Sequence, residues 1–331
     1  MARDVVVALP VGSSIRAQSE LHWRDRSGKR GSGRTVALSG LSAPVRLRGD
    51  GLATGAGLTF PLPADVERLK GRWVVRLEMD LERYLAGVVP YEMNPNWPDE
   101  ALRAQAVLAR TFALKRIEQR RKNGAPWDLV AGTEDQVFHW QEHPPRRIVQ
   151  LIRSTAGEVM RTRDGALAEV FYHSCSGGHT ADPAEVWGRP VAGLTTVEDT
   201  WDDVCPDFFW SLSLSPAELG TRLGTGPVDA IEILERGPSG RVVRIAVTAA
   251  GATQEWSGLK FRSAVGPREL KSTLFQVRVG DRQGAPVWLF QGSGSGHGVG
   301  LSQFGAKVMA ERGHDYREIL AFYFPRLQLD D

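Results

Sequence analysis

Residues 88–111 read VVPYEMNPNWPDEALRAQAVLART, a proline-rich segment followed by an alanine-rich one. Pro98 suits the first position of a helix, where its missing N–H is not needed, so a helix is predicted from Pro98 to about Arg121. A shorter helix is predicted before it, capped by Asp80 and ended by Pro90. The chain therefore places two helices around a short proline-rich loop.

Glu92 is the acidic residue of that loop, and it stands between Pro90 and Pro95 with Tyr91 and Trp97 nearby. Most glutamates are solvated surface charges. A carboxyl group held rigidly against apolar surface is different, because desolvation raises its pKa toward neutrality and makes it a usable general acid. Glu92 is therefore the candidate acid of this chain.

The remainder of the chain mixes strands and helices. The first 75 residues alternate short apolar runs with Gly, Ser and Arg, which is typical of β-structure. Two alternating segments joined by GPSG, residues 237–240, predict a hairpin. The predicted fold class is α+β. The predicted domains are residues 1–75, a β-rich N-terminal lobe, and residues 76–331, which contain a helical catalytic segment (78–122), a β-rich insert (about 225–290) and a Gly-rich loop with C-terminal helices (291–327).

Composition limits the class of function. The 331 residues are 42% hydrophobic and 24% charged, values typical of a globular protein with an ample core. The formal net charge of +2 does not favour a nucleic-acid partner. No run of about 18 apolar residues occurs, so no transmembrane segment is predicted. The N-terminal run VVVALP is shorter than the apolar core of a signal peptide, about 7–15 residues, and no signal peptide is visible.

The segment FYHSCSGGHT contains His173, Cys175 and His179, and Cys205 follows after a loop. Four nitrogen and sulfur ligands can build a closed tetrahedral zinc site, although this spacing matches no common zinc motif. A disulfide between Cys175 and Cys205 is the main alternative, and two free thiols are the third. A nucleophilic pair of Cys175 with His179 is a further alternative.

The glycine-rich segment GSGSGHGVG, residues 292–300, matches neither phosphate-binding fingerprint of the nucleotide-binding proteins. Its glycines are expected to let the backbone approach another part of the chain closely. His297 lies at its centre and is a candidate hydrogen-bonding or orienting residue.

Four blocks of the sequence resemble the family of stage II sporulation protein D and the amidase enhancer LytB, the SpoIID/LytB family. The resemblance covers about residues 76–327, in the order of the family. The blocks are LERYLAGVVPYEMNPNWPDEALRAQAVLARTFAL, DQVF, AEVFYHSCSGGHTADPAEVWG and GSGHGVGLSQFGAKVMAERGHDYREILAFYFP. The resemblance implies a lytic transglycosylase that cleaves peptidoglycan glycan strands, without stem peptides, between MurNAc and GlcNAc and leaves 1,6-anhydro-MurNAc ends.

The resemblance also implies roles for single residues. Glu92 matches the catalytic acid of the family, and Arg110 matches an arginine associated with activity, which could orient Glu92 or bind the lactyl carboxylate of muramic acid. One carboxyl group suffices, because it acts first as acid and then as base. No cofactor is required for this chemistry, and the candidate structural zinc near Cys175 is the one cofactor considered. The candidate sugar contacts are Gln136, Ser174, Gly177, Gly178, His297 and Gln303, with ring faces at Tyr91, Trp97 and Trp187.

Two other functions are compatible with these residues. One is a non-catalytic wall-binding protein that enhances a cell-wall amidase. The other is an ordinary glycoside hydrolase in which Asp99, Asp182 or Glu185 is the second carboxylate beside Glu92. The expected partners are glycan strands and a cell-wall amidase. The expected location is the cell envelope or another extracytoplasmic place.

Overall fold

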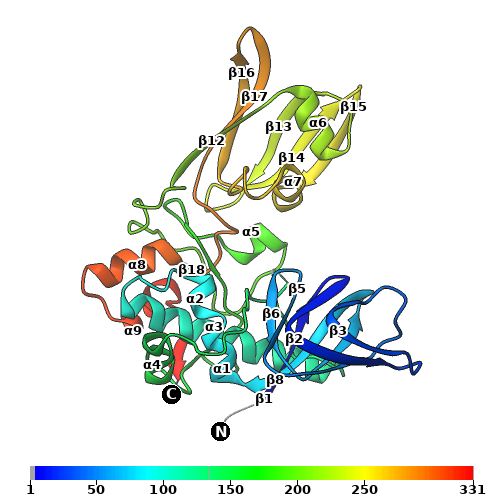
Figure 1. Ribbon diagram of the computed structural model, residues 1–331. Helices are drawn as coiled ribbons and strands as arrows, with labels where there is room; N and C mark the ends of the chain where they lie inside the picture. Colours follow the sequence, from blue (N-terminus) through cyan, green and yellow to red (C-terminus); the bar gives the residue numbers. More distant parts are fainter. Residues whose placement is uncertain (1–3, 133, 331) are drawn as a thin grey trace. The chain divides into compact units, whose positions relative to one another are not determined.

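The computed structural model describes residues 4–132 and 134–330, and these divide into two compact units (Figure 1). Unit 1 comprises the chain up to Trp97 together with Gln105–Val159, and unit 2 comprises Pro98–Ala104 and Met160–Asp330. Of the chain, 25% is helical and 37% is in strands, so the α+β prediction is confirmed. The domain boundary predicted at residue 75 falls inside a strand, Arg72–Asp80.

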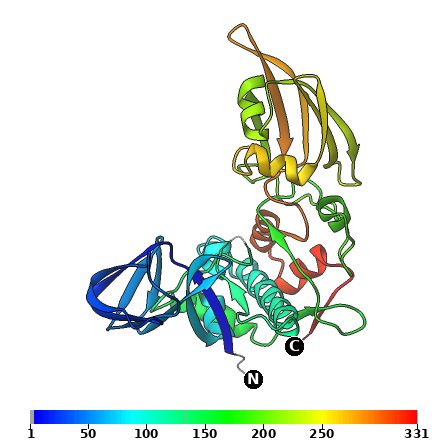
Figure 2. The ribbon, with the colours of Figure 1, turned by 90° about the vertical axis from the view of Figure 1, so that its right-hand side faces the viewer.

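Unit 1 contains a curled, mostly antiparallel sheet, drawn in blue to cyan in Figures 1 and 2. The strand order is β6-β5-β2-β4-β7-β8-β1-β9, and β3 pairs with β2. Along β2 the apolar Ile15, Ala17 and Leu21 are buried while most residues between them are exposed, as expected for a sheet with one solvated face. The strands are β1 (Asp4–Pro10), β2 (Ser14–Asp25), β3 (Arg30–Ala37), β4 (Val45–Arg48), β5 (Leu52–Gly55), β6 (Leu58–Pro61), β7 (Ala64–Leu69), β8 (Arg72–Asp80) and β9 (Leu129–Val130).

Short helices follow directly on this sheet. Helix α1 (Leu81–Ala86) begins at Asp80, whose side chain accepts a hydrogen bond from the backbone N–H of Arg83, so the predicted cap is confirmed. The prediction that Pro90 ends this helix is wrong. Helix α1 stops at Gly87, and Pro90 lies in the first turn of a second helix, α2 (Val89–Glu92), where a missing N–H costs nothing. Glu92 is thus the last residue of a helix rather than part of a loop.

Helix α3 (Asp99–Lys122) agrees with the predicted long helix to within one residue at each end. Small side chains on its buried face allow close packing, because they keep neighbouring elements near the helix axis. The last helix in this part of the chain is α4 (Arg146–Ser154), which buries Ile148, Leu151 and Ile152. The fully buried alanines of α3 are Ala101, Ala104, Ala106, Ala109 and Ala113.

Unit 2 contains the predicted hairpin, formed by strands β13 and β14, and an apolar core in which Trp210, Phe261, Phe275 and Phe290 are buried. Within the described residues, no helix combines the length and apolarity needed to cross a membrane. The strands of unit 2 are β10 (Val159–Arg161, beginning at the unit boundary), β11 (Tyr172–His173), β12 (Phe209–Leu214), β13 (Val228–Arg236), β14 (Val242–Ala249), β15 (Ala252–Ser257), β16 (Phe275–Arg282), β17 (Ala285–Ser293), β18 (Leu301–Ser302) and β19 (Gln328–Asp330). Its helices are α5 (Pro183–Trp187), α6 (Pro216–Leu223), α7 (Gly258–Val265), α8 (Gln303–Glu311) and α9 (Tyr316–Tyr323).

The glycine-rich loop precedes β18, which pairs in parallel with β11. Gly294, Gly298 and Gly300 all have positive φ values, a region that glycine enters without strain. A Cβ at Gly300 would lie 2.1 Å from the carbonyl oxygen of Phe171, and one at Gly298 would lie 2.5 Å from the guanidinium of Arg241. The glycines therefore allow close backbone approach, as the sequence predicted.

Candidate functional site

Glu92 is half-buried at the end of α2, and its Oε1 accepts a hydrogen bond from the backbone N–H of Val137 at 2.6 Å. The apolar neighbours Val89 and Met93 are buried at 1% and 2% exposure, so the turn that carries Glu92 is fixed on both sides. The following proline-rich loop is held by Arg147, which donates to backbone carbonyls in it. The carboxylate is therefore held in one orientation by the backbone around it.

The segment 136–139 positions α1 and α2. The hydroxyl of Tyr84 donates to Gln136 Oε1 at 3.1 Å, and the rings of Tyr84 and Phe138 stack with centroids 5.3 Å apart. The N–H of His139 donates to the carbonyl of Gly87 at 2.9 Å. A Cβ at Gly87 would lie 2.5 Å from the Phe138 ring, so only glycine fits where α1 ends. The DQVF block thus fixes the turn on which Glu92 lies.

His139 is a residue that the sequence analysis missed. Its ring stacks on Tyr91 with centroids 4.2 Å apart, and desolvation lowers the pKa of His139. Tyr91 itself is 43% exposed and precedes Glu92 in the chain. The pair offers solvent an aromatic face and a neutral imidazole beside the candidate acid. The one feature of the sequence that could have identified His139 is that it directly follows the DQVF block.

Arg110 is 1% exposed and makes a bidentate ion pair with Glu82, with Nε–Oε1 and Nη2–Oε2 distances of 2.9 and 2.8 Å. It also donates to the carbonyls of Ile152 and Glu158, both at 3.2 Å. The guanidinium thus joins α3 to α1 and to the end of α4. The predicted contact with a ligand carboxylate is not what this geometry shows, because the fork of Arg110 is already occupied and buried.

Gln136 is also buried, at 2% exposure, and its amide binds Tyr84 and the carbonyl of Ala109. Gln136 therefore holds the segment 136–139, which lies beside Glu92, through hydrogen bonds in the protein interior. The predicted direct contact of Gln136 with a sugar is not what the structure shows, because the amide faces protein groups.

Cys175 and Cys205 in unit 2 are both buried free thiols. Their mutual hydrogen bond and burial raise the pKa of Cys175, so it is not an activated nucleophile. His173 is buried and His179 is exposed. Among residues 4–132 and 134–330, no group of three or more His, Cys, Asp or Glu side chains could hold a metal ion. The four predicted zinc ligands therefore do not form a site, and the predicted disulfide is not formed either.

The burial of both thiols gives a prediction. In the native protein, reduced beforehand and then freed of reductant, Cys175 and Cys205 should react slowly with a thiol reagent such as DTNB, because each is at most 5% exposed. After unfolding in denaturant, two thiols per chain should react at once. The measurement is absorbance against time, with Cys175→Ser as the control that leaves one reactive thiol. Rapid reaction of the native protein would contradict the buried arrangement.

The segment 173–178 is held through its backbone. Asp202 Oδ2 accepts hydrogen bonds from the N–H groups of Ser176 and Gly177 and from the hydroxyl of Ser302. Arg241, 1% exposed, donates to the carbonyls of Ser176 and His179. Asp202 and Arg241 are lone residues in the sequence, and nothing in their local pattern marks them. They shape the loop that contains the predicted sugar contacts.

The predicted contacts of unit 2 lie on two neighbouring segments. Ser174 lies on the first, where its carbonyl accepts a hydrogen bond from the N–H of Phe304 at the start of α8, next to Gln303. Gly177 has φ +73°, and a Cβ there would lie 2.7 Å from the backbone N of Gly294. Gly178 follows in the same loop with φ +106°. Ser174, Gly177, Gly178 and Gln303 are all half-buried.

His297 lies among aromatic rings. Its centroid is 5.6 Å from that of His173 and 5.5 Å from that of Trp187, and the ring of Phe171 approaches both Trp187, at 4.5 Å, and His297, edge-on at 6.2 Å. Desolvation lowers the pKa of His297 to about 4, and its Nδ1 accepts the N–H of Val299 at 3.1 Å. The imidazole is therefore neutral at neutral pH and bound to the backbone of its own loop.

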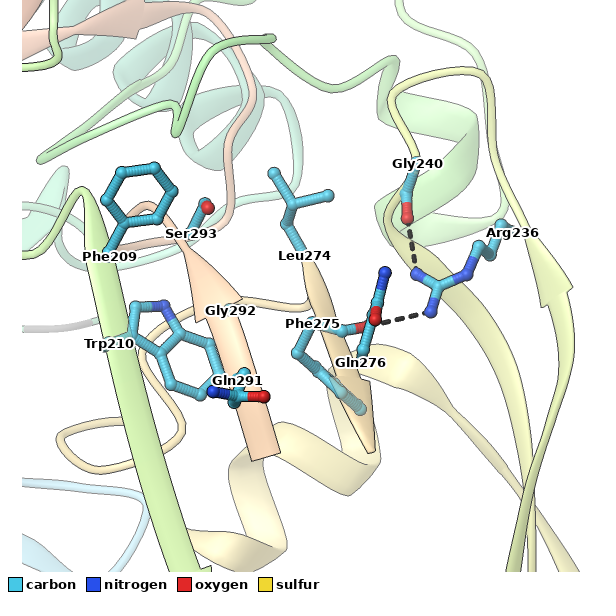
Figure 3. Close-up of a pocket in the computed structure, with 10 residues that line it drawn as sticks. All are labelled: Phe209, Trp210, Arg236, Gly240, Leu274, Phe275, Gln276, Gln291, Gly292 and Ser293. Atoms are coloured by element: carbon cyan, nitrogen blue, oxygen red, sulfur yellow. Dashed lines mark hydrogen bonds between the residues drawn. The ribbon is translucent and has the colours of Figure 1, made fainter. Parts of the chain in front are cut away.

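A cavity of about 480 Å³ lies on the sheet β12-β17-β16 (Figure 3). Gln276 and Gln291 are opposite partners in register, and Phe209 is opposite Ser293. Because side chains alternate along a strand, Phe209, Gln291 and Gln276 share one face. Phe209 is 77% exposed, and Arg236 at the rim is held by two backbone carbonyls. An exposed ring and two amides on one face of a sheet suit a sugar, which has apolar C–H faces and many hydroxyls.

Two segments of this chain match known protein families, and several known proteins are similar to most of the chain. The profile of a family described as "Stage II sporulation protein" matches residues 70–161, and that of a domain of unknown function matches residues 210–300. An uncharacterized protein of Brachyspira hyodysenteriae is 34% identical over 265 residues, which cover 78% of this chain and 68% of that protein. The stage II sporulation protein D of Bacillus subtilis is 29% identical, over 76% of this chain and 74% of its own length. The amidase enhancer of the same species is 27% identical, over 73% of this chain and only 39% of its own length.

Proposed function

This chain belongs to the SpoIID/LytB family, and we propose that it is a peptidoglycan lytic transglycosylase in which Glu92 is the single general acid and base. The proposed substrate is a glycan strand without stem peptides, cut between MurNAc and GlcNAc. The observation that carries this proposal is the half-buried carboxyl group of Glu92, which the N–H of Val137 holds on a rigid helical turn.

The reaction needs one group that first gives and then takes a proton. Protonated Glu92 gives its proton to the glycosidic oxygen, the C1–O bond breaks, and the GlcNAc hydroxyl leaves. The C6 hydroxyl of the muramic acid adds to the oxocarbenium-like C1 and gives its proton to the Glu92 carboxylate. Atoms balance without water, and Glu92 ends protonated. The Val137 N–H keeps the carboxyl group in one orientation during both transfers.

The neighbours of Glu92 suit a sugar substrate. The stacked pair of Tyr91 and His139 presents an exposed aromatic face, on which the C–H face of a pyranose can lie. The lowered pKa of His139 leaves it neutral at neutral pH, so it can donate to or accept from a hydroxyl without adding charge.

The structure also bears on the two-carboxylate hydrolase. Asp182 and Glu185 form the capping box of α5, and Glu185 additionally accepts hydrogen bonds from Ser239. These partners give both carboxylates a structural role, which favours a reaction with one catalytic carboxyl group. Asp99, the first residue of α3, remains the second carboxylate that a hydrolase mechanism would use.

Product analysis tests the proposal. The protein is incubated with peptide-free glycan strands, and the new ends are identified by mass spectrometry. We expect 1,6-anhydro ends, which are lighter by one water than reducing ends. Reducing ends would instead support the hydrolase. Intact strands that sediment with the protein would support a wall-binding enhancer, a role suggested by the relative named amidase enhancer. We propose a location in the cell envelope, where this substrate lies, and a cell-wall amidase as a partner.

The cavity on β12-β17-β16 gives a further prediction. Phe209→Ala should weaken binding of glycan strands by about threefold to tenfold, because an exposed ring stacked on a sugar contributes about 1 kcal/mol. The variant should keep its melting temperature, since Phe209 is mostly exposed. Val279→Ala, at 62% exposure and outside the cavity lining, is the matched control. Equal affinity of the parent and Phe209→Ala would remove this cavity from the proposed strand contacts.

A further inference from the structure

A second cavity lies on the N-terminal lobe, where β2 runs between β3 and β4. In register, Arg24 of β2 is opposite Arg30 of β3 on one side and Arg46 of β4 on the other. His22 lies two residues before Arg24 in β2 and is likewise opposite Ser32 of β3 on one side and Arg48 of β4 on the other. Because side chains alternate along a strand, these six residues share one face of the sheet. We call them the arginine array: His22, Arg24, Arg30, Ser32, Arg46 and Arg48.

Three arginines in one cross-strand row are costly, because like charges directly opposite each other destabilise a sheet. Within residues 4–132 and 134–330, the guanidinium groups of Arg24, Arg30 and Arg46 have no ion pair or hydrogen bond, whereas most other arginines of unit 1 have one. Asp65 of β7 is the cross-strand neighbour of Arg46, yet the two form no ion pair. Asp65 offsets part of the positive charge, but no described carboxylate forms an ion pair with these three guanidinium groups, so they stay available to a ligand.

The array surrounds a cavity of about 450 Å³, which is lined by its six residues together with Trp23 and Gly31. A Cβ at Gly31 would lie 2.7 Å from the ring of Trp23, so glycine is needed for the indole to lie against β3. Trp23 and Gly31 alternate with the array residues along β2 and β3, so this packing lies toward the opposite face of the sheet. The four guanidinium groups thus surround a shallow, open depression on the exposed face of the sheet.

We propose that the arginine array binds carboxylate groups of the wall glycan, with the lactyl carboxylates of muramic acid as the ligands. The guanidinium fork matches a carboxylate with two parallel hydrogen bonds. The charge is local, because the whole chain has a net charge of only +2, which does not favour a long polyanion such as DNA. The array lies before residue 70, where the stage II sporulation protein match begins, so it is separate from Glu92 in the sequence. The choice of ligand rests on the proposed function.

The test measures binding of the full chain to two forms of one ligand. Peptide-free glycan strands are used either with native carboxylates or with the carboxylates converted to methylamides, and Glu92→Gln is present throughout to prevent cleavage. We expect the native strands to bind at least about tenfold more tightly, with a difference that shrinks at high salt. When Arg24→Gln/Arg46→Gln is added to Glu92→Gln, native and amidated strands should bind with the same affinity. That affinity should equal the affinity of Glu92→Gln alone for amidated strands.

Controls separate this proposal from its alternatives. Arg16→Gln/Arg34→Gln removes two exposed arginines of the same strands outside the cavity lining and should leave affinity nearly unchanged. Arg24→Gln/Arg46→Gln should be at least as stable as the parent, because it relieves repulsion. Equal binding of native and amidated strands, or tighter binding of duplex DNA than of strands, would overturn the proposal. Carboxylate-dependent binding by Glu92→Gln, together with no cleavage of the same strands by the protein that retains Glu92, would uphold the array and reject the role of Glu92 alone.

Discussion

Glu92→Gln should lower the rate of glycan cleavage by about 10²–10⁴-fold, the range for loss of a general acid, and toward the upper end because one group performs both proton transfers. Glutamine has nearly the same shape, and its amide oxygen can still accept the N–H of Val137, so the turn should stay folded. The measurement is the appearance of 1,6-anhydro ends with time. Strand binding should change little, because the substitution removes proton transfer rather than contact area.

A matched control is Glu78→Gln, an exposed side chain near the end of β8 whose carboxylate pairs with Arg76 at the surface. It removes one carboxylate from the same unit and should cleave like the parent, since exposed ion pairs contribute little. Cleavage by Glu92→Gln at the parental rate would mean that another residue is the acid. Loss of cleavage together with a large drop in melting temperature would mean that Glu92 supports the fold instead.

The sequence predicted the secondary structure around Glu92 better than it predicted which groups contact the Glu92 side chain. The cap at Asp80 and the start of α3 follow from side-chain chemistry within a few residues, and both are confirmed. Pro90 was misread because proline is compatible with both the end of one helix and the first turn of the next. The N–H that holds Glu92 belongs to Val137, 45 residues away, and a backbone donor leaves no mark in a sequence.

The Cys–His segment shows another limit of the sequence. Residue types and rough spacing left a zinc site, a disulfide and two free thiols open, because the choice depends on side-chain directions that β11 and its loop determine; the structure shows free thiols. In the structure His173 lies beside the ring of His297, while the backbone of His179 pairs with Glu198. Asp202, which the sequence did not mark, instead fixes the loop through three hydrogen bonds.

For Arg110, the resemblance indicated an arginine associated with activity, but the sequence could not identify Glu82, 28 residues earlier, as the anion that pairs with its guanidinium. Arg110→Ala should destabilise the protein by about 3 kcal/mol. The side chain is 2% exposed and binds two backbone carbonyls, which the variant would leave without this donor. Glu82 is 34% exposed, so water can partly solvate it after the change, which keeps the loss at the lower end for buried pairs. The measurement is the free energy of unfolding in urea.

Two further variants separate a positioning role for Arg110 from a direct contact with substrate. If the arginine acts through α1, Glu82→Gln should weaken stability less than Arg110→Ala, and the double variant should lose less than the sum of the two single losses. Arg110→Lys should recover part of the stability, because it restores a charge but not the fork. Cleavage by the folded fraction of each variant should then fall mainly in kcat, since α1 leads directly into the turn that carries Glu92. If Arg110 instead binds the lactyl carboxylate, KM should rise in Arg110→Ala with unfolding unchanged, and Glu82→Gln should have no coupled effect.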